Sequence, residues 1–128
     1  MTGAAATAAA ALFLGMAAFQ AAMALGAPLG AHVLGGRNSG TLPNRLRLAS
    51  AMAGAILCAA AIVVLARAGL IGWPVEAAGV LPPAAWIIAG YMALNTLGNV
   101  TSKSRFERTI FATVTALLAV LSAYVAFS

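Results

Sequence analysis

Residues 23–36 read MALGAPLGAHVLGG, an apolar stretch that contains the helix-disrupting residues Gly26, Pro28 and Gly30. It continues an uncharged segment, so the sequence predicts one long helix over residues 5–34. At 1.5 Å per residue this helix is about 45 Å long, against a hydrocarbon core of about 30 Å, and must bend or tilt. Pro28 lacks an amide hydrogen and predicts a kink that acts as a hinge. Gly26 and Gly30 form a GxxxG pair that would let a second helix pack against the bend.

The composition around this stretch indicates a membrane protein. The 128 residues are 63% hydrophobic and 7% charged, whereas soluble domains carry about 25% charged residues. So few charged side chains cannot cover a surface that faces water, and lipid is the expected solvent. The net charge of +5 would suit nucleic acid only if Lys and Arg were clustered on one folded face. All seven instead lie at or between apolar segments, so we expect no nucleic-acid partner.

Three further apolar segments approach the roughly 20 residues that a helix needs to cross a bilayer. The predicted helices cover residues 5–34, 48–66, 83–100 and 108–127. The predicted fold is all-α, an integral membrane four-helix bundle that forms one domain over residues 1–128. MALGAPLG and MALNTLG each precede a basic loop in their half of the chain. This similarity fits either two tandem parallel hairpins or chance identity in an Ala-rich sequence.

Basic residues are distributed unevenly among the connections, which predicts the orientation. Six of the seven lie in the first and third connections: Arg37, Arg45, Arg47, Lys103, Arg105 and Arg108. The excess of basic residues places both connections in the cytoplasm, so both termini are expected outside. The same six residues form a basic rim that we expect to meet anionic lipid headgroups at the cytoplasmic face.

The polar residues within the predicted spans are uncharged. Gln20 lies near the middle of the first helix, while Tyr91, Asn95 and Asn99 recur every four residues along the third and share one face. Two interpretations stay open. The side chains could form hydrogen bonds between helices, each worth about 0.6–2 kcal/mol. Alternatively, they could line a cavity that binds a small hydrophobic or lipid-like molecule.

The residue types needed for catalysis are scarce. The chain has no Asp, one Cys and one His, and both Glu residues lie at loop edges. We therefore expect no enzyme, no metal site and no cofactor. Without a membrane-embedded carboxylate, a proton-coupled exporter of the small four-helix kind is disfavoured. Glu107 is interpreted as a charge partner of Arg105 and Arg108, and His32 as an interfacial hydrogen-bonding residue.

Residues 24–50, ALGAPLGAHVLGGRNSGTLPNRLRLAS, resemble small four-span integral membrane proteins of high-GC bacteria. The shared pattern is ALGxPxGxxxxGG followed by Leu-Pro and an Arg-rich helix start, and it covers mainly the first hairpin. The resemblance implies a bacterial cytoplasmic membrane and carries no activity. Two functions remain: binding or transport of a small lipid-like molecule, or an accessory scaffold in a larger membrane complex. Small-residue ridges also favour a homo-oligomer.

Overall fold

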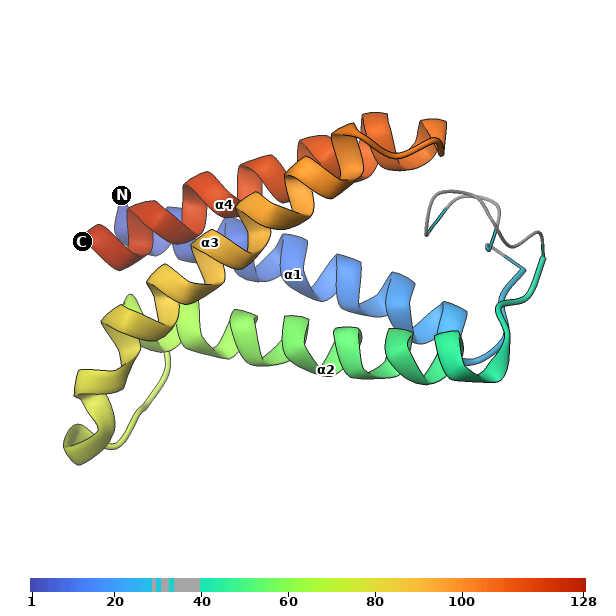
Figure 1. The fold of residues 1–128 in the computed structure, drawn as a ribbon. Helices are drawn as coiled ribbons and strands as arrows, with labels where there is room; N and C mark the ends of the chain where they lie inside the picture. The colour runs from blue at the N-terminus through green and yellow to red at the C-terminus, as the bar shows by residue number, and fades with distance from the viewer. Residues whose placement is uncertain (29, 31–32, 34–39) are drawn as a thin grey trace.

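Four long helices form the molecule in a computed structural model that describes residues 1–28, 30, 33 and 40–128. They are α1 (Thr2–Ala24), α2 (Asn44–Arg67), α3 (Leu81–Val100) and α4 (Ala112–Phe127). A 3-10 turn, η3 (Val75–Val80), leads into α3, and a π-helical turn, η4 (Glu107–Phe111), leads into α4. The helices pack as an all-α bundle, as the composition predicts (Figure 1). With η3 counted into α3 and η4 into α4, each is long and apolar enough to span a membrane, which is the architecture of a four-span membrane protein.

Successive helices run antiparallel, so the two termini lie at the same end of the bundle (Figure 1). There, the Thr2 hydroxyl donates to the Ser128 hydroxyl over 3.0 Å. The Arg67 guanidinium at the end of α2 also donates to the carbonyls of Ala126 and Ser128. The described residues of the first and third connections lie at the opposite end, called the loop end below; they are residues 25–28, 30, 33, 40–43 and 101–106. Pairing is most extensive within the α1–α2 and α3–α4 hairpins; whether these are duplicates stays a prediction.

Small side chains let α1 and α2 approach closely. The buried face of α1 consists largely of alanines around Phe13, whose side chain is fully buried. Where the two helices cross, a Cβ added at Gly54 would lie 3.5 Å from the Gln20 Cβ and 3.6 Å from the Ala17 carbonyl oxygen. Small residues favour such contacts in membranes, because packing rather than water exclusion drives the association of helices in lipid.

The prediction that the first helix continues to residue 34 with a kink at Pro28 is wrong, because α1 ends at Ala24. Gly26 has a φ of 103°, in the left-handed region that ends a helix. Its N–H donates to the Met23 carbonyl over 3.1 Å, and the Ala27 N–H donates to the Ala22 carbonyl over 3.0 Å. This pair of bonds is a Schellman motif, which satisfies carbonyls that the last turn would otherwise leave open.

The early end also changes the interpretation of the residues that follow. Pro28 lies outside the helix, where proline commonly follows a glycine cap because it cannot continue a helix. Gly26 and Gly30 therefore form no GxxxG packing surface; the Gly30 N–H instead donates to the Gly40 carbonyl over 2.7 Å. The 23 residues of α1 extend about 35 Å, which matches the bilayer core without a bend.

Arg47 reinforces this helix end from α2. Its Nε donates to the Ala24 carbonyl oxygen over 3.0 Å, and the Thr41 hydroxyl donates to the Gly26 carbonyl over 3.1 Å. A guanidinium at a helix C-terminus also interacts favourably with the helix dipole. Arg47, predicted as part of the basic rim, therefore fixes α1 to the start of α2. The predictions made for His32 and Arg37 lie outside the described residues.

The other three helices begin and end within about one turn of their predicted ranges. The end of α2 repeats the cap of α1: Gly69 has a φ of 77°, and its N–H donates to the Ala66 carbonyl over 3.0 Å. At the loop end, three aromatic rings join α1 to the start of α4. Phe19 stacks on Phe106 at 5.8 Å and meets Phe111 edge-on at 5.0 Å between ring centroids.

Candidate functional site

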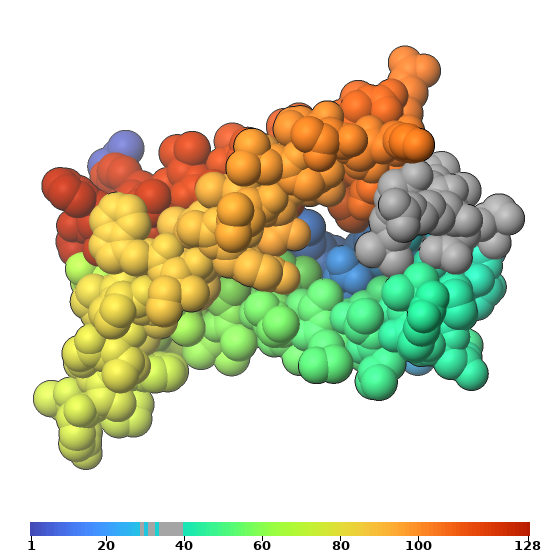
Figure 2. All heavy atoms as spheres, viewed as in Figure 1, coloured from blue at the N-terminus to red at the C-terminus, as the bar shows by residue number. Residues whose placement is uncertain are grey.

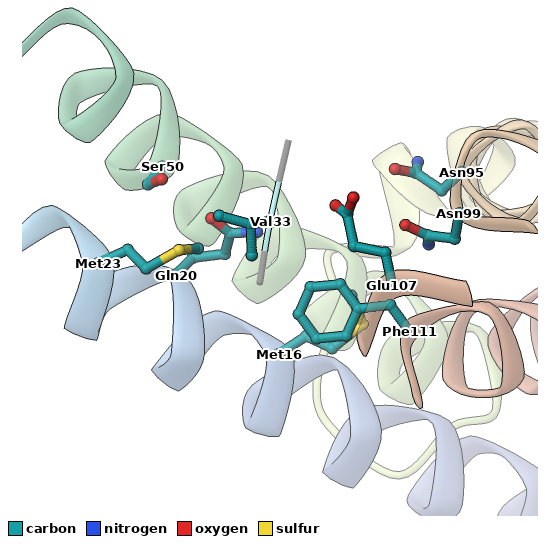
Figure 3. A pocket seen from close by; sticks show the side chains of 9 residues that line it. All are labelled: Met16, Gln20, Met23, Val33, Ser50, Asn95, Asn99, Glu107 and Phe111. Carbon is teal, nitrogen blue, oxygen red and sulfur yellow. The ribbon is translucent and has the colours of Figure 1, made fainter. Parts of the chain in front are cut away.

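A polar cavity of about 150 Å³ lies in the loop-end half of the bundle. Figure 2 shows a hollow in the surface between α2 and the loop-end half of α3, and α1 is visible at the floor of this hollow. Nine described residues line it: Met16, Gln20, Met23, Val33, Ser50, Asn95, Asn99, Glu107 and Phe111 (Figure 3). Five of the nine are polar and come from α1, α2, α3 and η4, so every helix of the bundle, or the turn leading into it, contributes to one site.

Helical spacing explains how these side chains meet. Asn95 and Asn99 are four residues apart on α3 and share a face, as predicted. Gln20 is four residues after Met16 on α1, which turns its amide toward the same space. Glu107 occupies the first position of η4 and lies between Gln20 and the two asparagine side chains (Figure 3). The structure thus brings together three of the four side chains proposed from sequence.

Hydrogen bonds show that the asparagines differ. The Asn99 amide donates to the Thr115 hydroxyl over 3.4 Å, and Thr96 donates to the same hydroxyl over 2.9 Å. Thr115 is buried on α4, so Asn99 and Thr96 join the two helices of the hairpin. The Asn95 amide instead donates to the Tyr91 carbonyl of its own helix over 2.8 Å. Packing therefore accounts for Asn99 in part, and Asn95 is left to face the cavity.

The Gln20 amide makes no hydrogen bond to any residue that the structure describes, and the same holds for the Asn95 side-chain oxygen. Both side chains are partly buried, so these groups stay accessible. Both groups border the cavity, where a water molecule or a ligand can reach them. The polar lining is therefore suited to hold a hydrogen-bonding molecule.

Tyr91 lies outside this cavity, although it shares a helix face with Asn95. Its side chain is half-exposed and lines a separate apolar groove of about 240 Å³ between α1, α2 and α3. Phe13, Ile56 and Met92 also line this groove. Tyr91 lies one turn from Asn95 on α3, and Phe13 lies one turn from Met16 on α1, so the groove lies about one helical turn from the cavity along the bundle. The hydrogen-bonding role proposed for Tyr91 alongside the amides does not fit this position.

Two polar residues of the cavity, Ser50 and Glu107, were not proposed as ligand-binding residues from the sequence. Glu107 begins the fourth span, and its carboxylate lines the cavity. This position at the edge of the third connection agrees with the sequence prediction, which did not place the side chain in a cavity. Ser102 donates a hydrogen bond to the carboxylate, and the Glu107 N–H donates to the Ser104 hydroxyl over 3.4 Å. The spacing Ser104-x-x-Glu107 is a capping-box pattern, the signal that would have placed Glu107 inside the first helical turn.

The basic rim divides into two groups. Arg108 donates to the carbonyls of Ser102 and Lys103 over 2.9 and 3.0 Å, so it stabilises the loop before η4, as Arg47 stabilises the end of α1. Arg45, Lys103 and Arg105 are exposed at the loop end. Among the described rim residues, the second group is exposed and can meet other molecules through its charge.

Comparison of the chain with protein-family models, curated proteins and solved structures finds no match. The functional argument therefore depends on the geometry of the cavity.

Proposed function

We propose that this four-span protein is non-catalytic and binds the polar end of a small lipid-like molecule in the cavity between its helices. The observation that carries the proposal is the set of polar side chains from α1, α2, α3 and η4 around about 150 Å³ of space. In an apolar bundle such groups are costly unless they are hydrogen-bonded, and Gln20 has no partner among the described residues. Ligand sites typically combine apolar walls with a few convergent polar groups.

The adjoining groove supports a ligand with an apolar tail. Its wall contains Phe13, Ile88 and Met92, with essentially no polar surface, and it begins one turn from the cavity. A molecule with its headgroup between Gln20 and Asn95 can extend an alkyl chain along this groove, where the surrounding lipid is equally apolar. The cavity and groove together fit an amphipathic molecule better than a wholly polar or a wholly apolar one.

We place the cavity in the cytoplasmic half of a bacterial inner membrane, with both termini outside. The exposed residues Arg45, Lys103 and Arg105 support this orientation, because basic residues are enriched on cytoplasmic loops. Their charge suits contact with anionic lipid headgroups on the same face.

A pair of reporter fusions checks the orientation. A reporter that is active only in the cytoplasm is expected to stay silent when fused after Ser128 and to be active when fused after Ser102. A reporter that is active only outside is expected to give the opposite pattern. If each reporter instead gives the pattern expected of the other, the bundle is inserted in the opposite orientation.

Asn95→Leu is expected to lower the amount of bound lipid-like molecule roughly tenfold or more, because it removes an amide worth about 1.5 kcal/mol and fills part of the cavity. The wild-type protein and the variant are purified in mild detergent, and the retained molecules are extracted and quantified by mass spectrometry. Circular dichroism during heating shows that both proteins are folded.

Asn44→Leu provides the matched control, since Asn44 is exposed at the start of α2 and does not line the cavity. It is expected to retain the wild-type amount. A wild-type protein with no retained amphipathic molecule, or equal retention by all three proteins, would contradict the proposed function.

The second function, an accessory scaffold in a larger membrane complex or a homo-oligomer, is favoured by a different surface. Ala17, Ala21, Gly54, Ala55 and Cys58 line an open groove of about 310 Å³ between α1 and α2. Small residues of this kind let another helix approach closely. Recovery of a defined membrane partner in the same purification, without an amphipathic molecule, would favour this function over ligand binding.

A further inference from the structure

The hydroxyl of Ser50 is a polar group on α2 that is withdrawn from water at the wall of the cavity. Its side chain is 6% exposed, and its hydroxyl makes no hydrogen bond to any residue that the structure describes. A buried hydroxyl is costly unless something bonds to it. We infer, on the basis of the proposed function, that the ligand has a small polyol headgroup, as in a monoacylglycerol, and that Ser50 is one of the residues that recognise it.

Two further groups without a partner face the same space from other helices. The Asn95 amide nitrogen on α3 donates to the Tyr91 carbonyl, so its oxygen is the group left for the cavity. The Gln20 amide on α1 keeps both its donors and its acceptor. Ser50 and Gln20 lie on one side of the cavity and Asn95 lies on the other (Figure 3). A molecule that satisfies all three must bond at more than one point, and it must donate to Asn95.

Neighbouring hydroxyl groups meet this requirement. Each hydroxyl donates one hydrogen bond and accepts up to about two. One hydroxyl of a diol can donate to the Asn95 oxygen and the second to the Gln20 oxygen, while both accept from the Gln20 nitrogen or the Ser50 hydroxyl. An ether or ester oxygen accepts only, so a headgroup built from these groups alone leaves the Asn95 oxygen without a donor.

The size of the cavity matches a glycerol unit. Its volume is about 150 Å³, and a cavity of about this volume in another protein holds benzene, a molecule of about six non-hydrogen atoms. Glycerol has the same number of non-hydrogen atoms, whereas the headgroup of a phospholipid is larger. The Glu107 carboxylate also borders this space and accepts a hydrogen bond from Ser102. The polyol needs no contact with this carboxylate.

The test compares two probes with the same alkyl chain. They are 1-O-dodecylglycerol and dodecyl 2-methylbutyl ether, in which a methyl group replaces each hydroxyl. Each probe is titrated into the detergent-solubilised protein, and the bound fraction is measured by native mass spectrometry. The wild-type protein is expected to bind dodecylglycerol roughly tenfold or more tightly than the ether, because a site that bonds to hydroxyl groups rejects the analogue that lacks them.

Ser50→Ala is expected to weaken the binding of dodecylglycerol about three- to tenfold and to leave the binding of the ether unchanged, since it removes one hydrogen bond to the headgroup. Without added probe, this variant is expected to unfold in sodium dodecyl sulfate at the same or a slightly higher concentration than wild type. Alanine favours the helix, and the serine hydroxyl has no partner in the described protein to lose. A serine that serves only packing would not change the ratio of the two probes.

Ser122→Ala is the matched control. Ser122 on α4 is also buried, and its hydroxyl has no partner among the described residues, but it does not line the cavity. This variant is expected to resemble Ser50→Ala in its unfolding and to bind both probes as wild type does.

The outcomes separate the ligand class from the proposed function. If the wild-type protein does not prefer dodecylglycerol, or if Ser50→Ala leaves the ratio of the two probes unchanged, the polyol class is wrong. The proposed function then still stands, provided that Asn95→Leu lowers the amount of amphipathic molecule retained in purification. If Asn95→Leu changes neither that amount nor the binding of either probe, the cavity is not the site, and both proposals fail.

Discussion

Gly54→Leu is expected to lower the free energy of unfolding by about 1–3 kcal/mol, because overpacking a close helix contact forces the backbones apart. Gly54 is buried where α2 crosses α1, and a Cβ at this position already lies 3.6 Å from the Ala17 carbonyl oxygen. Alanine therefore fits in ordinary contact, whereas the further atoms of leucine meet the backbone of α1. The measurement is the unfolding transition in mixed micelles with increasing sodium dodecyl sulfate, followed by far-ultraviolet circular dichroism.

Gly90→Leu is the matched control. Gly90 is exposed on α3, and a Cβ there meets nothing within 4 Å. Because leucine favours a helix over glycine by about 0.8–1 kcal/mol, this variant is expected to be as stable as wild type or slightly more stable. Equal stability of the Gly54 and Gly90 variants would show that α1 and α2 do not approach as closely as described.

The Gly54 contact also controls the cavity, since the same added Cβ would lie 3.5 Å from the Gln20 Cβ. Separation of α1 from α2 is expected to move the Gln20 amide relative to Asn95 and to weaken ligand binding together with stability. Gly54→Ala is the comparison variant: because its Cβ fits in ordinary contact and keeps α1 and α2 together, it is expected to retain both stability and ligand binding.

Hydropathy and spacing predict the parts of this molecule that repeat along the chain. Apolar length places α2, α3 and α4, and a four-residue period places Asn95 and Asn99 on one face. The four-residue period does not predict how far along that helix face a cavity extends. Tyr91 belongs to the same stripe, but it lies one turn beyond the cavity, where the three helices form an apolar groove instead.

Glu107 shows a second limit of the sequence. Its neighbours Arg105 and Arg108 suggest local charge pairing, and a loop-edge carboxylate is usually solvated. The structure places it inside the first turn before α4, where the helix start directs it toward the bundle while Arg108 contacts the loop carbonyls. The capping pattern locates Glu107 in a turn, but the facing wall of Gln20 and Ser50 depends on how separate helices pack. Sequence periodicity within one helix contains no information on that packing.

Gly26→Val is expected to lower the free energy of unfolding by about 2 kcal/mol, because a left-handed conformation costs most residues about 1–2 kcal/mol and a β-branched residue more. Gly26 has a φ of 103°, and a Cβ there would lie 3.5 Å from the Arg47 guanidinium. Valine would therefore strain the backbone and also disturb the bond from Arg47 to the Ala24 carbonyl that fixes the end of α1. The same detergent titration measures the loss.

Gly15→Val is the control within the same helix, since Gly15 lies in the middle of α1 and a Cβ there meets nothing within 4 Å. Valine is slightly better than glycine in a helix, so this variant is expected to match or exceed the wild type. The comparison also decides between the two interpretations of MALGAPLG. If the helix continued through Gly26 to a kink at Pro28, the two valine variants would behave alike. A loss confined to Gly26→Val instead means that the first span ends at a glycine cap, whose carbonyls at Ala24 and Gly26 accept hydrogen bonds from Arg47 and Thr41.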